Sequence, residues 1–262
     1  MKLTILGSGT NVHPRRAAAG YLVQTDRLFL LDLGPRTLMN LLKTDVDRHQ
    51  IRHMLFSHYH ADHVSDFITF FFDAVYHARY VGTRAPLTLI GPPGTRRLFR
   101  SILGAFPSFT AAAFPVTLRE VTTRPFRIGR TRIIPRPVLH SRGLPCLGYR
   151  IEFGGRVLAY SGDSQYCESV VRLCRQADVA VLDCSFPADR PGPGHMHAGE
   201  CGQVAREAGV RRLILSHFYP VADQADVRRQ ARREYRGTIV RGKDLMTVSI
   251  STSAGGRRRG SQ

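Results

Sequence analysis

Residues 57–63 of this 262-residue chain read SHYHADH and place four potential metal ligands within six positions. The apolar segment before them predicts a β-strand, and a helical pattern follows. Neutral imidazole and carboxylate groups are donors through which proteins bind zinc, manganese and iron. Alternate side chains of an extended segment point to the same side, so His58 and His60 can bind one ion together. Asp62 and His63 lie where the chain turns into the helix and can reach a second ion. A solvated polar loop is the alternative, but it leaves the clustering unexplained.

Further donors follow other segments that predict strands. His140 comes after an apolar pair, Asp163 lies in the glycine turn YSGDS, and His217 follows the segment LILS. Each of them alone would be an ordinary loop residue. A hydrolytic site with two metal ions about 3.5–4 Å apart needs additional donors and commonly a bridging carboxylate. Together the three residues complete the ligand set that residues 58–63 begin.

These motifs resemble those of the metallo-β-lactamase-fold hydrolases, and most of all those of the ribonuclease Z-like branch. The matching segments run nearly from end to end of the chain: LGSGT at 6–10, LDLG at 31–34, HYHADH at 58–63, GPPGT at 91–95, His140, GYR at 148–150, SGD at 161–163, GH at 194–195 and LSH at 215–217. The resemblance implies an α/β (α+β) protein with the four-layer αβ/βα sandwich of the metallo-β-lactamase fold. It places the metals at one edge, between the two sheets.

The resemblance also implies which residue holds which ion. It assigns His58, His60 and His140 to the first metal, assigns Asp62, His63 and His217 to the second, and makes Asp163 the bridge. The cofactors are therefore two divalent metal ions per chain. Zinc is the expected metal, and manganese and iron share the same donors.

Two residues take catalytic roles by this resemblance. In the branch, metal-activated water attacks phosphorus, and Asp62 is the proposed proton acceptor. His195 matches the histidine that protonates the leaving oxygen, although a histidine in a Gly/Pro loop is the alternative. His197 either joins the site or begins the next helix with Glu200 in a capping box.

Two buried-strand carboxylates, Asp32 and Asp183, are expected at the metal edge. Carboxylates in such places commonly orient ligand histidines, but both could equally cap turns. Relatives in the branch usually carry Glu at the position of Asp183. A run of aromatic residues at 67–76 forms either a buried helix or an exposed dimer surface or pocket wall.

Hydrophobic periodicity predicts eleven strands and six helices. The strands are expected at 3–6, 21–24, 28–31, 53–56, 87–90, 116–120, 131–134, 147–152, 156–160, 179–182 and 212–215, and the helices at 37–43, 67–76, 96–103, 168–175, 197–208 and 225–235. Two mixed sheets with helices on their outer faces satisfy this pattern. No linker interrupts the chain, so we expect a single hydrolase domain at 1–252 and a disordered basic tail at 253–262.

Composition limits the partners and the compartment. The formal net charge is +18, and 35 of the 38 basic residues are arginine, which suggests a polyanionic partner or merely codon bias. The five cysteines form no CxxC pair and fit a reducing compartment. No signal-peptide core or membrane span is evident, so we expect a cytoplasmic protein without a membrane partner. The family often forms homodimers, which is a further possibility here.

One departure from the branch concerns the substrate. Bacterial ribonuclease Z enzymes that process transfer RNA precursors carry a long RNA-gripping arm, and the matching place here holds only Phe153-Gly154-Gly155, a tight hairpin turn. The leading hypothesis is a dinuclear phosphodiesterase for RNA, nucleotides or cyclic nucleotides. A lactonase or β-lactamase-type hydrolase with the same centre is the alternative, and a non-catalytic nucleic-acid-binding protein is a third reading.

Overall fold

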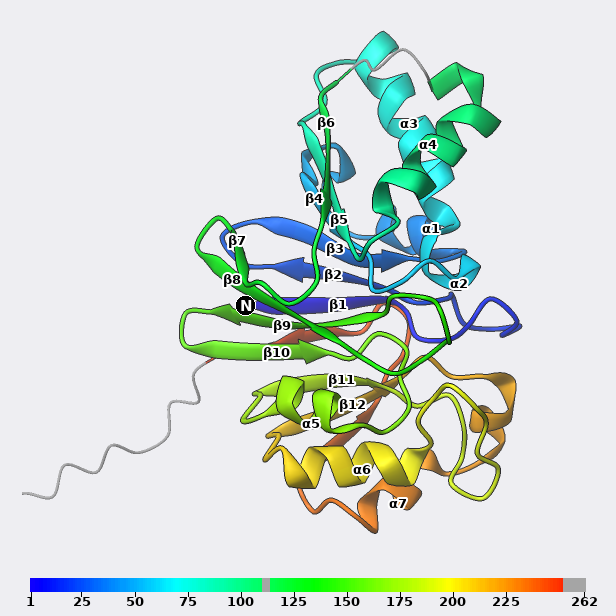
Figure 1. Ribbon diagram of the computed structural model, residues 1–262, viewed down its shortest axis with the longest axis vertical. Helices are drawn as coiled ribbons and strands as arrows, with labels where there is room; N and C mark the ends of the chain where they lie inside the picture. The colour runs from blue at the N-terminus through cyan, green and yellow to red at the C-terminus, as the bar shows by residue number, and fades with distance from the viewer. Residues whose placement is uncertain (110–113, 252–262) are drawn as a thin grey trace, which may run out of the picture.

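Two seven-stranded mixed sheets pack against each other, with helices on the outer face of each (Figure 1). The computed structural model describes residues 1–109 and 114–251, and the tail predicted at 253–262 lies outside them. The arrangement is the four-layer sandwich expected from the sequence, which confirms the predicted fold class.

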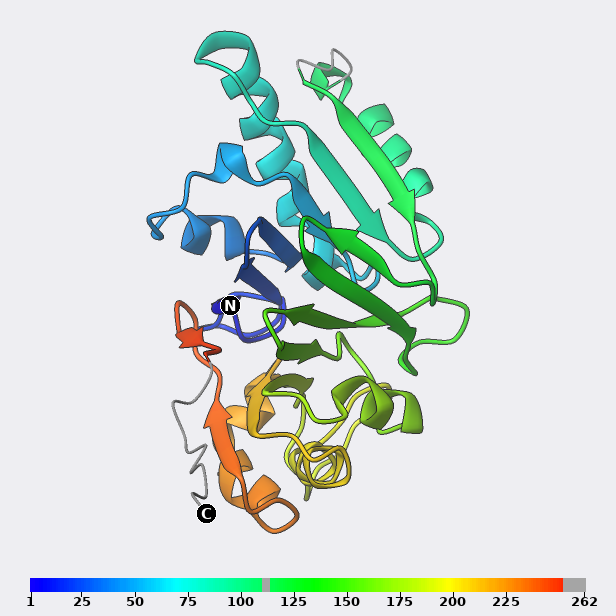
Figure 2. The ribbon, with the colours of Figure 1, turned by 90° about the vertical axis from the view of Figure 1, so that its left-hand side faces the viewer.

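The first sheet has the strand order β14-β1-β2-β3-β4-β5-β6. Its strands are β1 (Lys2–Gly7), β2 (Gly20–Gln24), β3 (Leu28–Leu33), β4 (His53–Leu55), β5 (Leu87–Gly91), β6 (Val116–Glu120) and β14 (Thr247–Ser249). Strands β3 to β6 are parallel neighbours, whereas β14, β1, β2 and β3 pair antiparallel. The last strand of the chain thereby returns to the strand that begins it (Figure 2).

The second sheet has the order β13-β12-β11-β10-β9-β8-β7. Its strands are β7 (Phe126–Ile128), β8 (Thr131–Pro137), β9 (Leu147–Phe153), β10 (Arg156–Tyr160), β11 (Val179–Asp183), β12 (Arg212–Ser216) and β13 (Thr238–Arg241). Strands β10 to β13 are parallel, and β7 to β10 form antiparallel hairpins. Each sheet therefore sends the carboxyl ends of several parallel strands to one edge.

Helices cover the outer faces. The α-helices are α1 (Thr37–Leu41), α2 (Ala61–Val64), α3 (Asp66–Tyr80), α4 (Thr95–Ala105), α5 (Glu168–Cys174), α6 (Ala198–Glu207) and α7 (Val227–Arg232), and the 3-10 turns are η1 (Arg48–Gln50), η2 (Pro107–Phe109) and η3 (Pro220–Gln224). The first four α-helices pack on the first sheet and the last three on the second. Within the described residues, none of these helices has both the length and the apolar character of a bilayer span.

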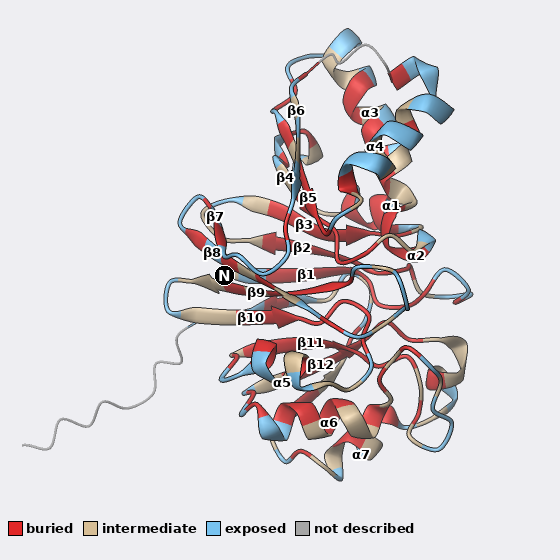
Figure 3. Cartoon of the chain, in the orientation of Figure 1, coloured by how far each residue is buried: buried red, intermediate tan, exposed pale blue. Residues whose placement is uncertain are grey.

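Apolar side chains form three layers, one between the sheets and one beneath each set of helices. Figure 3 shows buried residues along the strands of both sheets and exposed residues mainly on the helices and loops. Three buried tyrosines of the central layer each hydrogen-bond across to the other sheet's half of the molecule. Tyr21 of β2 bonds Ser216, Tyr149 of β9 donates to the carbonyl of Phe56, and Tyr160 of β10 donates to Asp32. Because buried polar groups need partners, these bonds fix how the sheets dock.

The aromatic run at 67–76 divides between the two readings. Phe67, Phe70 and Phe71 are buried beneath α3, which confirms the buried-helix reading for them. Phe72 and Tyr76 are each 53% exposed on the outer side of the same helix. The helical period of 3.6 residues explains the division, since residues 72 and 76 lie one turn apart on the face turned from the sheet.

The predicted strands and helices all occur, with ends shifted by a few residues. Three short strands, β7, β13 and β14, were not predicted, because segments of three or four residues give little periodic signal. The hairpin between β9 and β10 is as short as the sequence indicates. Gly154 and Gly155 have φ values of 58° and 69°, the positive pair of a two-residue type I′ turn.

We expect Gly34→Ala to destabilise the protein, because β3 meets the metal-ligand loop at this residue. A Cβ atom at Gly34 would lie 1.8 Å from the carbonyl oxygen of Asp62. Relieving that overlap should cost about 1–3 kcal/mol in the free energy of unfolding, measured by urea denaturation. Gly104→Ala on α4 is the control, since its Cβ meets nothing within 4 Å. Equal urea midpoints for Gly34→Ala and the wild type would contradict the expectation.

Candidate metal centre

Loops at the carboxyl ends of four strands bring the predicted ligands to one edge of the sandwich. Residues 58–63 follow β4 of the first sheet, and His60 is the N-cap residue of α2 with extended backbone. His140, Asp163 and His217 follow β8, β10 and β12 of the second sheet. Strand ends are a common place for ligands in open α/β sheets.

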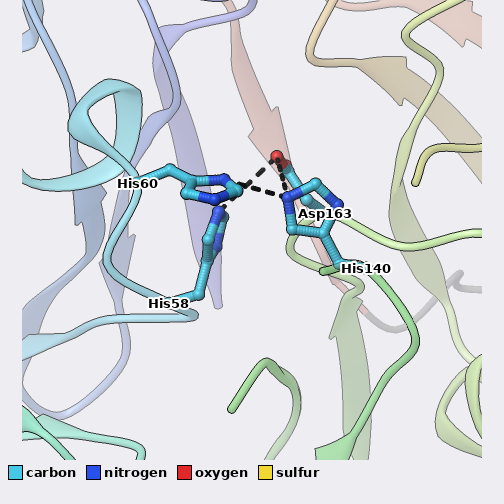
Figure 4. A group of neighbouring side chains, drawn as sticks. All are labelled: His58, His60, His140 and Asp163. Carbon is cyan, nitrogen blue, oxygen red and sulfur yellow. Dashed lines mark hydrogen bonds and ion pairs between the residues drawn. The ribbon is translucent and has the colours of Figure 1, made fainter. Parts of the chain in front are cut away.

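The first ligand group contains His58, His60, His140 and Asp163, whose donor atoms all lie within 4.8 Å of one another. Figure 4 shows the three rings around the carboxylate. Asp163 Oδ2 lies 3.7 Å from His58 Nε2 and 3.7 Å from His140 Nε2. His140 Nε2 also lies 3.0 Å from His60 Nδ1. The resemblance described above assigned these three histidines to the first ion, with Asp163 as the bridge to the second.

The second ligand group contains Asp62, His63, Asp163 and His217, again within 4.8 Å. Asp163 Oδ1 lies 3.1 Å from His63 Nε2 and 3.3 Å from His217 Nε2. His217 Nε2 is also 3.4 Å from Asp62 Oδ2. All four residues are buried, whereas His60 and His140 of the first group are half-buried. The side chains of His195 and Asp62 are 9% and 12% exposed, whereas that of His140 is 5% exposed.

Asp163 presents a different oxygen to each group, as a carboxylate that bridges two cations would. Two buried atoms of the centre, His58 Nε2 and Asp163 Oδ1, make no hydrogen bond within the described residues. Leaving such atoms unpartnered in a protein interior is unfavourable, and a cation beside them would offset that cost. The nitrogen and oxygen donors suit zinc, manganese or iron, so the residues fit two divalent ions.

Asp32 holds His63 in place. Its Oδ2 accepts from His63 Nδ1 at 2.8 Å and from the Ser57 hydroxyl at 2.7 Å, and its Oδ1 accepts from the Ser57 amide at 2.7 Å. Because Nδ1 is occupied, Nε2 of His63 is left to face Asp163. Asp32 adopts a left-handed backbone conformation with φ 54°, which is uncommon for residues other than glycine and often occurs at functional sites.

Asp183 connects His195 to His217, which belongs to the second ligand group. Its Oδ2 accepts from His195 Nδ1 at 2.8 Å, and its Oδ1 accepts from the Ser185 hydroxyl at 2.6 Å. The same hydroxyl lies 3.0 Å from His217 Nδ1. Asp183 therefore reaches both His195 and the hydroxyl beside His217 with its short side chain. The second nitrogen of His195, Nε2, makes no hydrogen bond to the part of the chain that the structure describes.

The loop before α6 contacts His140 of the first ligand group and also carries His195. The carbonyl of Gly194 accepts from His140 Nδ1 at 2.7 Å, and the next residue is His195. His197 lies outside both ligand groups. Its side chain accepts from the amides of Gly199 and Glu200, and Glu200 bonds back to the His197 amide, so it begins α6 through the capping box that the sequence offered as one reading.

Burial and charge divide the histidines into two kinds. Burial, with neighbouring imidazoles, lowers the pKa of His58 and His60, so both are neutral. Burial opposes the charged form of His63 and His217 too, but the surrounding carboxylates together outweigh it and raise the pKa of both rings: Asp163 and Asp32 around His63, and Asp163, Asp183 and Asp62 around His217. The pKa of Asp163 is lowered, since the charges of His217 and His63 outweigh its burial.

Sequence reasoning missed several residues that support the centre. Ser57 and Ser185 carry hydrogen bonds between the carboxylates and the ligand rings, and Tyr160 donates to Asp32. The Tyr219 ring lies 5.6 Å from the His195 ring and 6.2 Å from the His217 ring, between centroids. In the sequence, only the position of Tyr219 two residues after His217 indicates that its ring lies beside these histidines.

Comparison with known proteins agrees with this architecture. A family model described as "Beta-lactamase superfamily domain" matches residues 27–218. An uncharacterized protein of Mycobacterium tuberculosis is 33% identical over 252 residues, which cover 91% of this chain and 88% of that protein. A ribonuclease Z of Mycobacterium bovis is 27% identical over 277 residues, covering 95% and 98%. The crystal structure of the metallo-beta-lactamase fold protein YhfI from Bacillus subtilis superposes with TM-score 0.81 and 25% identity, covering 94% and 98%.

We expect metal binding at pH 7 to release about two protons per chain, because His63 and His217 must lose theirs to become ligands. Titration calorimetry of the metal-free protein with zinc, in buffers of different ionisation enthalpy, measures that number. Affinity should fall as the pH is lowered, since more of both rings is then protonated. His217→Gln should release about one proton fewer. His53→Gln, at a histidine outside both groups, is the control, and release of no protons by the wild type would contradict the expectation.

Proposed function

This chain belongs to the β-lactamase superfamily and is a metallo-β-lactamase-fold hydrolase, and from that premise we propose that it is a dinuclear, zinc-dependent phosphodiesterase acting on RNA, nucleotides or cyclic nucleotides. The observation that carries the proposal is His195, held by Asp183 beside the ligand groups. When bound, two divalent ions would lower the pKa of water and offset negative charge on phosphoryl oxygens.

His195 is suited to donate a proton to a leaving oxygen. Burial disfavours its charged form, but the carboxylates of Asp183 and Asp163 outweigh burial and raise the pKa of its ring. The raised pKa favours the protonated ring, with Nδ1 bonded to Asp183 and Nε2 left to donate. An alkoxide leaving from phosphorus needs such a proton, so this geometry serves phosphodiester cleavage.

Asp62 is suited to orient the attacking water. Burial alone would favour its neutral form, but the His217 hydrogen bond and the charge of His63 outweigh burial and lower the pKa of the carboxyl. Ionised Asp62 can accept a hydrogen bond from that water, and Asp163 holds both ligand groups together beside it. These roles follow the residues that the sequence indicated for proton transfer.

A cluster of basic side chains supports a polyanionic substrate. A cavity of about 600 Å³ is lined by Arg228, Arg229, Arg232, Arg241, Lys243 and Asp226. Arg241 ends β13, the parallel neighbour of the strand that leads to His217, so the cavity opens near the metal edge. Part of the +18 charge is thereby gathered where a nucleic-acid backbone could follow it towards the centre.

We expect His195→Ala to lower the kcat of hydrolysis of a thymidine dinucleotide, whose leaving group is an alkoxide, by about 10²–10⁴-fold in zinc-loaded protein, because the leaving oxygen loses its proton donor. The loss on bis-p-nitrophenyl phosphate should be much smaller, because p-nitrophenolate leaves without needing a proton. In the wild type, activity should fall as the pH rises past the raised pKa of His195, and this alkaline limb should be absent from the variant. His197→Ser is the matched control, since serine keeps an N-cap acceptor for α6.

The same protein should be tested on a panel of lactones and β-lactams with its metal content measured. Hydrolysis of lactones in preference to phosphodiesters would identify the alternative hydrolase. Metal-loaded protein that is inert on both, while binding RNA in a salt-sensitive manner, would overturn the proposal in favour of a nucleic-acid-binding protein.

A further inference from the structure

A cavity of about 450 Å³ opens beside His140, outside the two ligand groups. Small-molecule sites commonly have volumes of about 300–1,000 Å³. The cavity is lined by His140, which also belongs to the first ligand group, so the cavity adjoins the centre. A substrate whose phosphoryl group reached the metals would therefore place an adjoining group in this cavity, which we call the His140 pocket.

The walls of the His140 pocket are mainly apolar and rigid. Pro92 and Pro93 form one part, and Val138, Leu139 and Leu144 form another. Leu139 is 61% exposed although it directly precedes a ligand histidine. Its carbonyl accepts from the Gln165 amide at 2.7 Å, so the backbone that carries this exposed side chain is fixed. An exposed leucine inside a cavity marks a surface that is covered when a ligand binds.

The wall formed by Pro92 and Pro93 is also held in place by hydrogen bonds. The Pro92 carbonyl accepts from the Tyr59 hydroxyl at 2.9 Å and from the Thr95 hydroxyl at 2.9 Å. Proline has a restricted φ and loses little freedom when a ligand packs on it. The pocket therefore offers preformed apolar surfaces from two separate loops, one after β5 and one after β8.

A few polar side chains complete the lining. Thr122 and Gln165 are exposed residues. Neither the Thr122 hydroxyl nor the side-chain amide of Gln165 makes a hydrogen bond to the described residues. Gln165 offers both a donor and an acceptor, which match the edge of a nucleobase. Arg142 is the one permanently charged side chain among the described lining residues, and no carboxylate lines the pocket.

We propose that the His140 pocket holds the nucleobase of a nucleotide substrate, which deepens the proposed function and rests on it. A base has two apolar faces for the proline and leucine walls and a hydrogen-bonding edge for Gln165 and Thr122. A sugar alone would leave the apolar walls uncovered, and an alkyl chain would leave both polar groups unused. The pocket would thereby make the enzyme recognise the base of its substrate as well as the phosphate.

Binding to metal-free protein tests the pocket without relying on catalysis. Thymidine 5′-phosphate and deoxyribose 5-phosphate differ only by the base, and chemical-shift titration compares their affinities. We expect the base to strengthen binding about tenfold or more, and Leu139→Asp to remove that gain. Leu42→Asp, at another exposed leucine, is the control. Equal binding of the two ligands to the wild type would overturn the proposal.

Turnover separates failure of the pocket from failure of the proposed function. Thymidine 5′-(p-nitrophenyl phosphate) and methyl p-nitrophenyl phosphate share a leaving group, and zinc-loaded wild type should favour the first in kcat/KM by about tenfold or more. Leu139→Asp and Gln165→Ala should reduce that preference, because each should lower kcat/KM on the nucleoside ester more than on the methyl ester.

Hydrolysis of both esters with a preference that neither variant changes would overturn the pocket and leave the phosphodiesterase intact. Hydrolysis of neither ester by the wild type would overturn the proposed function, while the binding titration still decides whether the pocket recognises a base. Thermal unfolding of each variant identifies any loss caused by misfolding.

Discussion

The buried carboxylate of Asp163 is the group around which this edge of the molecule is organised. Four histidine nitrogens lie within 3.7 Å of one or other of its oxygens. Together with Asp32, Asp62 and Asp183, this carboxylate raises the pKa of His63 and His217, and it could join two cations when they are bound. Its negative charge would therefore stabilise both the metal-free centre, in which the rings bind protons, and the metal-bound centre, in which cations replace those protons.

Around Asp163, three imidazoles each have one nitrogen occupied by a hydrogen bond and the other directed towards the centre. Asp32 engages His63, Ser185 engages His217, and the Gly194 carbonyl engages His140. Left-handed backbone at Asp32 and His217 is part of the same arrangement, because it turns those side chains off their strands into the centre. The site is therefore built by short hydrogen bonds from strand ends, and its precision depends on the docking of both sheets.

Sequence patterns predicted the architecture well because its long strands and amphipathic helices repeat at clear periods. The seven proposed ligands meet as the spacing and the resemblance indicated, since each follows a strand whose carboxyl end reaches the same edge. The supporting hydroxyls of Ser57, Ser185 and Tyr160 could not be predicted in this way, because serine and tyrosine are common and their roles depend on three-dimensional contacts. The His140 pocket was equally out of reach, since loops from β5, β8 and β10 form it together.

Neither half of the sandwich holds a complete ligand group. The loop after β4 supplies two donors to each group, and the loops after β8, β10 and β12 supply the others. A bound cation would therefore cross-link the halves much as a disulfide joins distant segments, beside the tyrosine bonds that already span them. The affinity of the centre for metal would therefore add to the free energy that holds the two halves together. Removal of the metal would weaken the packing of one sheet against the other.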